Sequence, residues 1–234
     1  MPDLLALDRV TAGYGAAVVL EEITLSLAEG DSLALLGRNG VGKTTLLKTI
    51  MGLTDRIDGS ITLGGSDLGA LPTHRRALEG IGYVPQGRGV IPHFTVRENI
   101  VMGTFARRDR RREIPSIALE LFPALRASLN RMGGVLSGGQ QQQLAIARAL
   151  AADPRIILLD EPTEGIQPNI VEQIEEAIAR LNREHRITIV LVEQNVDFAR
   201  RAAQRFIIME KGRIAAEGAV AELTDQLVHR HMAV

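Results

Sequence analysis

The sequence predicts an α/β fold with a parallel sheet at its core, an N-terminal antiparallel β part and an inserted helical subdomain. Two short runs, the continuously apolar Ile156–Leu159 and the largely apolar Ile187–Val192, fit strands that are covered on both faces. Between them, apolar residues recur at the spacing of one helix face: Ile170, Ile174, Ala177, Ile178 and Leu181. Strand, helix and strand in this order form the βαβ unit of a doubly wound sheet.

Three further segments extend this core. Ser32–Leu36 is a short apolar run that ends in Gly37, and it is predicted to be a buried strand. Lys43–Met51 is predicted to be a helix, and Ile81–Val84 another strand. Strands and helices therefore alternate, as a parallel sheet requires.

Other regions depart from this alternation. Near the N-terminus, Leu5–Leu7 and Ile23–Leu27 alternate apolar and polar residues, as antiparallel strands do. Thr95–Ala151 is predicted to be mostly helical, which makes it an insertion into the α/β core. Val220–Val234 is predicted to be a terminal helix and tail.

Composition excludes several classes of protein. The 234 residues carry 27 Lys and Arg against 28 Asp and Glu, and 3% are aromatic. Nucleic-acid binding is not expected, because it needs excess cations for phosphates and aromatic rings for bases. The sequence has no cysteine, which excludes disulfides and thiolate zinc sites. It lacks a signal peptide and any apolar run near the roughly 18 residues that span a bilayer, so one cytoplasmic domain is expected.

A phosphate-binding loop is predicted at Gly37–Thr44, which has the spacing G-x-x-x-x-G-K-T between a strand and a helix. Glycines let main-chain N–H groups converge on phosphate oxygens, and the helix start adds its positive dipole end. Lys43 can reach the β- and γ-phosphates, and the Thr44 hydroxyl can bind Mg²⁺. A plain glycine turn is the alternative. The candidate nucleotide-binding residues here are Gly37, Asn39, Gly40, Gly42, Lys43, Thr44 and Thr45.

A carboxylate pair follows the apolar strand Ile156–Leu159. Ligands of an open α/β sheet bind beyond the carboxyl ends of its strands, which places Asp160 to hold Mg²⁺. Glu161 is then free to orient and deprotonate an attacking water. Taken alone, the pair would be an acidic turn before Pro162; beside a phosphate-binding loop, the catalytic interpretation is favoured.

A second anion site is predicted at Leu136–Gln140, the sequence LSGGQ. Ser137 and Gln140 have the spacing of a capping box, so Ser137 should cap a helix that runs through Ala151. Together with Gly37–Thr44 and Asp160–Pro162, this segment resembles the ATP-binding subunit of an ABC transporter, a P-loop ATPase. The resemblance runs over essentially the whole chain.

The ABC resemblance implies a single domain over residues 1–234. Residues 1–86 and 152–234 would form the nucleotide-binding core, and 87–151 the helical signature subdomain. We call Leu136–Gln140 the signature segment. ATP would lie between two subunits, and each subunit would bind one nucleotide with its phosphate-binding loop and contact the other with its signature segment. The implied contacts to the partner's ATP come from Ser137, Gly138, Gly139 and Gln140.

Other positions carry implied roles. Tyr14 resembles the aromatic residue that stacks on adenine, although an ordinary turn tyrosine is the alternative. Gln86 resembles the glutamine that meets Mg²⁺ and the attacking water and relays to the permease. Gln167 and Gln194 stand where the family usually has aspartate and histidine. The glutamine amide can donate a hydrogen bond to a phosphate, but it cannot take up a proton or carry a charge. Gln194 can therefore sense a phosphate but cannot serve as a base, which favours Glu161 in that role.

The segments Glu164–Pro168 (EGIQP) and Val192–Gln194 (VEQ) resemble the corresponding segments in the ATP-binding subunits of importers for branched-chain amino acids and urea. Further strings, among them Pro85–Arg88 and the four glutamines Gln140–Gln143, look closest to the urea-type subunit. The implied partners are two permease subunits, a second ATP-binding subunit and, indirectly, a solute-binding protein. A heterodimer is expected and a homodimer stays open. The expected location is the cytoplasmic face of the inner membrane, with a soluble chain when it is expressed alone.

Two rival functions remain for the sequence. A soluble ABC-type ATPase acting on DNA or ribosomes would need a coiled-coil insertion or a second cassette, and neither is present. Another P-loop kinase or hydrolase would leave Leu136–Gln140 without a role.

Overall fold

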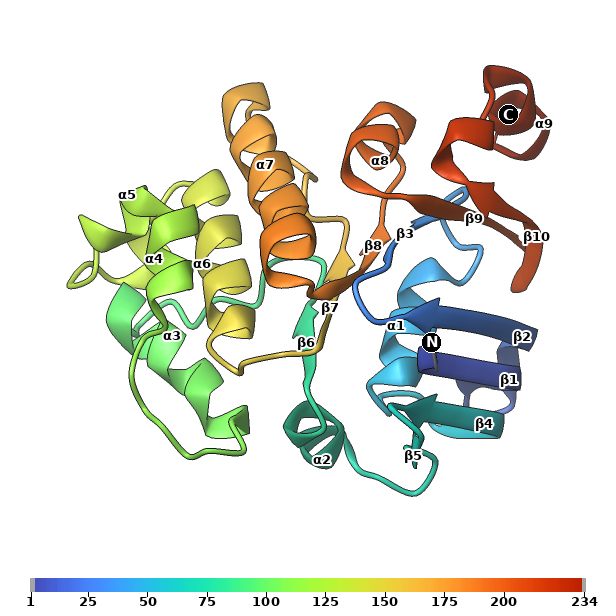
Figure 1. Ribbon diagram of the computed structural model, residues 1–234, viewed down its shortest axis with the longest axis horizontal. Coiled ribbons are helices and arrows are strands. Elements are labelled where there is room, and N and C mark those ends of the chain that lie inside the picture. Colours follow the sequence, from blue (N-terminus) through green and yellow to red (C-terminus); the bar gives the residue numbers. More distant parts are fainter. Residues whose placement is uncertain (1–2, 233–234) are drawn as a thin grey trace.

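Two sheets organise the structure, a computed structural model that describes residues 3–232 (Figure 1). The larger sheet has the order β10-β9-β3-β8-β7-β6. Strands β9, β3, β8, β7 and β6 are parallel, and β10 is antiparallel to β9. Its strands are β3 (Ser32–Leu36), β6 (Ile81–Val84), β7 (Ile156–Asp160), β8 (Thr188–Val192), β9 (Arg205–Glu210) and β10 (Arg213–Ala219). The predicted parallel core is therefore confirmed, and β9 and β10 add to it.

The second sheet is antiparallel, with the order β2-β1-β4-β5. It consists of β1 (Asp3–Tyr14), β2 (Ala17–Ala28), β4 (Arg56–Leu63) and β5 (Ser66–Asp67). The predicted N-terminal antiparallel strands are confirmed, but β4 and β5 are an addition. The first half of β4 is mostly exposed, so its sequence lacks a clear alternation.

Helix α1 (Lys43–Ile50) lies between the two sheets. Helices α7 (Pro168–His185) and α8 (Val196–Ala202) cover the other face of the larger sheet (Figure 1). One hydrophobic core joins Leu5 and Leu27 of the small sheet to Leu47 of α1 and Leu35 of β3. The remaining helices of this half are α2 (Thr73–Leu78), the 3-10 helix η3 (Val220–Glu222) and α9 (Asp225–Met232). The segment predicted to be a terminal helix and tail thus contains η3 and α9, and residues 233–234 lie outside the described part.

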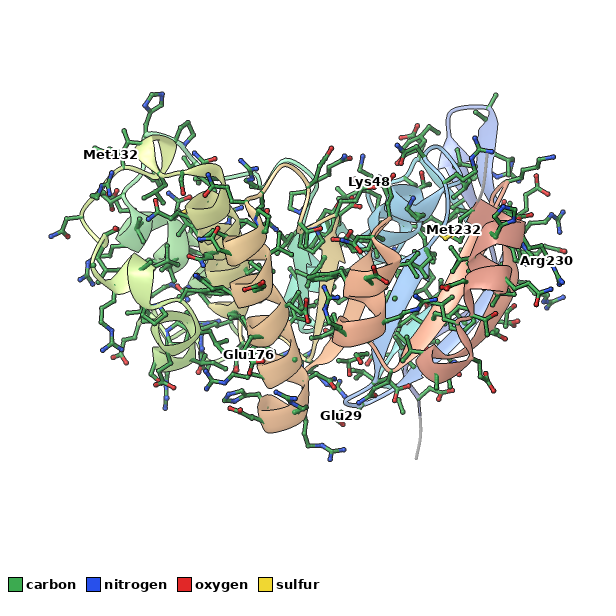
Figure 2. All side chains as sticks on the ribbon, turned by 90° about the horizontal axis from the view of Figure 1, so that it is seen from above. Glu29, Lys48, Met132, Glu176, Arg230 and Met232 are labelled. Atoms are coloured by element: carbon green, nitrogen blue, oxygen red, sulfur yellow. The ribbon has the colours of Figure 1, made fainter. Side chains whose placement is uncertain are left out.

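A group of helices packs at the β6 end of the larger sheet (Figure 1). Its members are α3 (Val96–Gly103), η1 (Thr104–Ala106), α4 (Ser116–Leu121), α5 (Pro123–Arg126), η2 (Gly133–Val135) and α6 (Gly138–Leu150). In Figure 2, Met132 of this group and Arg230 of α9 mark opposite ends of the molecule. Across residues 3–232, none of the helices combines the length and the hydropathy that a bilayer crossing needs.

The sheet brings four loops to one edge. Because β3, β8, β7 and β6 are parallel neighbours, their carboxyl ends lie side by side. Beyond these ends follow Gly37, Glu193, Glu161 and Pro85, each the start of a loop. A ligand site is expected at this edge.

Candidate active site

A pocket of about 370 Å³ opens at the carboxyl ends of these strands. All four loops contribute to it directly: the phosphate-binding loop follows β3, Gln86 follows β6, Glu161 follows β7 and Gln194 follows β8. Its lining consists of Val19, Asn39, Gly40, Gly42, Lys43, Thr44, Thr45, Gln86, Glu161, Glu164 and Gln194. The structure therefore brings nine of the sequence-predicted residues together.

The glycines of the phosphate-binding loop are required for two different reasons. All three have left-handed backbone angles, with φ of 141° at Gly37, 79° at Gly40 and 108° at Gly42. A Cβ at Gly37 would lie 2.6 Å from the Met209 carbonyl oxygen, and one at Gly42 would lie 2.9 Å from a Leu20 methyl. A Cβ at Gly40 would meet nothing within 4 Å, so its side is open towards a ligand.

Lys43 supplies the cation of the loop and is 5% exposed. Its Nζ donates to the carbonyl oxygens of Gly37, at 2.6 Å, and Arg38, at 3.0 Å. Burial lowers the pKa of Lys43, and the charges of Glu161 and Asp160 partly oppose this shift. The first turn of α1 has no acidic residue, so the helix dipole and Lys43 both favour an anion here.

Asp160 lies behind the pocket, 1% exposed at the end of β7. Its Oδ1 accepts a hydrogen bond from Thr44 Oγ1 at 3.0 Å, and its Oδ2 one from the Tyr83 hydroxyl at 3.4 Å. Burial raises the pKa of Asp160, while the donated hydrogen bond from Thr44 opposes the rise.

The oxygens of Thr44 and Asp160 fit Mg²⁺. Residues 3–232 contain no cluster of three or more His, Asp or Glu that could enclose a metal. Mg²⁺ does not need such a cage, because it binds through one or two protein oxygens, waters and substrate phosphates. The hydroxyl and carboxylate, 3.0 Å apart beside the phosphate-binding loop, are a donor set of that kind.

Glu161 stands between two glutamine amides. Gln194 Nε2 donates to its Oε1 at 2.8 Å, and Gln86 Nε2 lies 3.3 Å from its Oε2. Gln86 Nε2 also donates to Glu164 at 2.9 Å. The backbone of Glu161 has φ of 48°, a left-handed angle that is unfavourable for a glutamate and that clusters at functional sites.

Three residues around the site were not predicted. Val19 and Glu164 line the pocket, and Glu193 lies 3% exposed behind Gln194. The signal for Glu193 was present, because a charged residue directly follows the fully buried strand β8. For Val19 no sequence signal existed, since the strand that carries it is distant from the motifs.

The signature segment lies outside this pocket, at the start of α6. Ser137 Oγ accepts from the Gln140 main-chain N–H at 3.3 Å, and Gln140 Oε1 accepts from that of Ser137 at 3.1 Å, as the predicted capping box requires. A Cβ at Gly139 would lie 2.6 Å from an Ile170 methyl, and one at Gly138 3.0 Å from the Arg88 guanidinium. These glycines therefore permit close packing.

Two other predicted positions lie away from the lining. Tyr14 ends β1 and is 37% exposed. Gln167 precedes α7 in an extended conformation, and its side chain does not cap that helix.

A phosphate-binding loop after β3 and a buried carboxylate at the end of β7 define a P-loop nucleotide-binding protein. Comparison with known families matches residues 20–164 to the family described as "ABC transporter". The chain belongs to this family and is one of its ATPases.

Two curated relatives and one solved structure extend this result. The chain is 40% identical to "High-affinity branched-chain amino acid transport ATP-binding protein BraG" of Pseudomonas aeruginosa, over 94% of both chains. It is 36% identical to "Probable branched-chain amino acid transport ATP-binding protein LivF" of Archaeoglobus fulgidus, over 93% of this chain and 92% of the relative. A dimeric ATP-binding cassette in a post-hydrolysis state with ADP and Pi has a TM-score of 0.82 and 30% identity, covering 92% of this chain and 98% of that one.

Proposed function

We propose that the chain is the ATP-hydrolysing subunit of an ABC importer and that Glu161 is its general base. The observation that carries this proposal is the carboxylate of Glu161, held by the Gln194 and Gln86 amides at the rim of the pocket that Lys43 lines. A carboxylate in that place can accept a proton from a water directed at a γ-phosphate.

The other residues of the site have three proposed roles: they bind the phosphates, hold Mg²⁺ and position Glu161. Lys43 and the main-chain N–H groups at the start of α1 would bind the β- and γ-phosphates. Thr44 and Asp160 would hold Mg²⁺, and Gln86, which lines the same pocket, would join them. The metal would neutralise charge on the phosphate oxygens. Gln86 and Gln194 keep the Glu161 carboxylate in place with their amide N–H groups.

We further propose that ATP joins two subunits. The start of α6, with Ser137, Gly138, Gly139 and Gln140, would contact the γ-phosphate bound to the partner. The dimeric cassette with 30% identity supports this arrangement. Residues 87–151 would then form the signature subdomain, and 1–86 with 152–234 the nucleotide-binding core. Tyr14 would stack on adenine.

A second pocket, of about 580 Å³, supports docking of a permease. It lies where α2 and β6 meet the helical group, and exposed apolar side chains stand at it: Met102 is 42% and Phe105 61% exposed. An apolar helix of a permease subunit would fit there. Two permeases, a second ATP-binding subunit and a solute-binding protein complete the proposed complex, at the cytoplasmic face of the inner membrane.

The solute belongs to one of two classes, branched-chain amino acids or urea and short amides. The names of the two relatives, both branched-chain amino acid transport proteins, support the amino acids. The urea alternative depends on short strings such as Pro85–Arg88 and Gln140–Gln143.

Replacing Glu161 tests the proposed base. Glu161→Gln should leave ATP affinity within about twofold and lower hydrolysis by about 100-fold or more, since general-base catalysis contributes about 10²–10⁴-fold. ATP affinity is measured by calorimetry and turnover by phosphate release. The exposed Glu176→Gln, on α7, is the control and should hydrolyse ATP normally. Near-normal turnover of Glu161→Gln would show that another group is the base.

Reconstitution tests the transport role and the solute. The chain is assembled with its permeases in proteoliposomes, and ATP turnover is measured with loaded binding protein and leucine or urea. Stimulation by one solute identifies its class. If the chain neither associates with a permease nor responds to either solute, the soluble ABC-type ATPase is the better description.

A further inference from the structure

A buried carboxylate outside the pocket is left without a role by this function. Glu193 directly follows β8 and is 3% exposed. It does not line the pocket, so it does not reach a nucleotide. Burying a charged group costs free energy unless hydrogen bonds replace its water.

The contacts of Glu193 connect two loops and the strand β3. Its Oε1 accepts from the Thr163 hydroxyl at 2.7 Å and from the Thr163 main-chain N–H at 3.3 Å. Its Oε2 accepts from the main-chain N–H of Gln194 at 3.2 Å. Its own N–H donates to the carbonyl oxygen of Leu35, two residues before the phosphate-binding loop, at 3.2 Å.

These contacts close a ring around the proposed base. Thr163 is two residues after Glu161, and Gln194 is the neighbour of Glu193. The ring is completed by Gln194 Nε2, which donates to Glu161 Oε1 at 2.8 Å. The main-chain N–H of Glu161 also donates to the Val192 carbonyl oxygen at 3.0 Å, so the bond between Glu193 and Thr163 is a second link between the two loops, and it holds the Glu161 loop on the side beyond the base.

A purely stabilising role explains this arrangement poorly. Burial raises the pKa of Glu193, although the hydrogen bonds from Thr163 and from main-chain N–H groups oppose the rise. A buried charge is a weak source of stability compared with an apolar side chain of similar volume. What the carboxylate supplies is two acceptors that face two different loops, which one apolar group cannot replace.

We propose that Glu193 is a positioning residue for ATP hydrolysis, which fixes the Glu161 loop and the Gln194 loop relative to each other. The proposal rests on the proposed function of Glu161. Displacement of a catalytic group by about 1 Å can lower turnover by about 100-fold, so the bond between the two loops matters for kcat. Nucleotide binding depends on other residues and should persist.

Two variants test the ring. In Glu193→Gln, one oxygen becomes an amide nitrogen, which then faces a main-chain N–H of either Thr163 or Gln194. We expect kcat to fall about tenfold or more, with ATP affinity and KM within about twofold. Thr163→Val removes the hydroxyl donor at nearly constant shape and should lower kcat about threefold to tenfold. Glu175 on α7 forms an ion pair with Arg201 on α8. The control Glu175→Gln removes this carboxylate and should leave kcat unchanged.

The double variant separates positioning from stability. If Glu193 acts through Thr163, Glu193→Gln with Thr163→Val should lose no more kcat than Glu193→Gln alone. Multiplied losses would overturn the proposal, and so would normal kcat in both single variants. Thermal unfolding monitors folding, and if Glu193→Gln does not fold, Thr163→Val decides: unchanged kcat refutes the role. Glu161→Gln is measured in parallel. Its normal turnover would refute the proposed base, whereas an inactive Glu161→Gln beside fully active Glu193→Gln and Thr163→Val refutes only the role of Glu193.

Discussion

Glycines lie at the beginning of both α1 and α6, because Gly42 directly precedes α1 and Gly138 opens α6. The sequence predicts an anion site at each start, yet the two starts are built differently. Helix α1 follows Gly42 in a left-handed conformation and has no side-chain cap. Helix α6 is capped by its own Ser137 and Gln140 in a reciprocal box. The first start depends on backbone conformation and on Lys43, and the second satisfies two of its N–H groups, those of Ser137 and Gln140, with its own side chains.

The difference indicates two kinds of phosphate contact. The start of α1 combines a buried cation, a helix dipole and an open side at Gly40, which suits permanent binding within one chain. The start of α6 is stable without a ligand, which suits a surface that meets a nucleotide only when two subunits approach. Substitutions at each start should therefore separate affinity from turnover.

The largest effect is expected at the start of α1. Lys43→Ala removes the cation, and since a hydrogen bond to a charged group contributes about 1.5–3 kcal/mol, ATP affinity should fall about 10- to 100-fold or more. Calorimetry measures the loss. Lys48→Ala, on the same helix but outside the pocket, is the control and should bind ATP normally. Unchanged affinity in Lys43→Ala would contradict the difference between the two starts.

An intermediate effect is expected at the start of α6. A Cβ at Gly139 would lie 2.6 Å from Ile170 Cγ2, so Gly139→Ala should destabilise the fold by about 1–3 kcal/mol through overpacking. Chemical denaturation measures the change. Ile170→Ala in the same chain removes the clashing methyl and should restore part of the loss. ATP affinity of the single chain should stay within about twofold; a large drop would mean that α6 shapes the pocket of its own chain.

The smallest effect concerns the caps. Ser137→Ala should lower the free energy of unfolding by about 1 kcal/mol, or Tm by about 2–4 °C, because it removes an N-cap. Thr95→Ala is a matched control, since Thr95 and Glu98 form the same capping box on α3. Both variants should lose similar stability, but only Ser137→Ala should also lose ATP turnover. Equal turnover in the two variants would show that Ser137 acts only as the N-cap of α6 and has no part in ATP hydrolysis.

Much of the fold could be predicted because its signals are local. The strands β3, β6, β7 and β8 are short apolar runs, and their predicted bounds agree with the structure to within one residue. β4, β5, β9 and β10 escaped prediction. Many residues of β4, β5 and β10 are exposed, so burial imposes little pattern on them, whereas β9 is a short buried run whose local signal was overlooked. β4 is defined by its pairing with the distant strand β1, which a local pattern does not contain, whereas β5 and β10 pair with the strands that directly precede them, β4 and β9.

The site divides in the same way. Lys43, Thr44 and Asp160 belong to motifs with fixed spacing, so the sequence indicated them before any contact was known. The hydrogen bonds from Gln86 and Gln194 to Glu161 cross 75 and 33 residues of chain, and only the sheet order brings them together. Glu193 remained unnoticed because its function, as proposed, depends entirely on such distant neighbours.

The left-handed backbone of Glu161 has a consequence for engineering. A non-glycine residue at such an angle costs about 1–3 kcal/mol, so Gly at position 161 would relieve strain while removing the proposed base. A library screened only for heat resistance would therefore enrich inactive clones at this position. Screening programmes on this scaffold should hold residue 161 constant and seek their gains elsewhere.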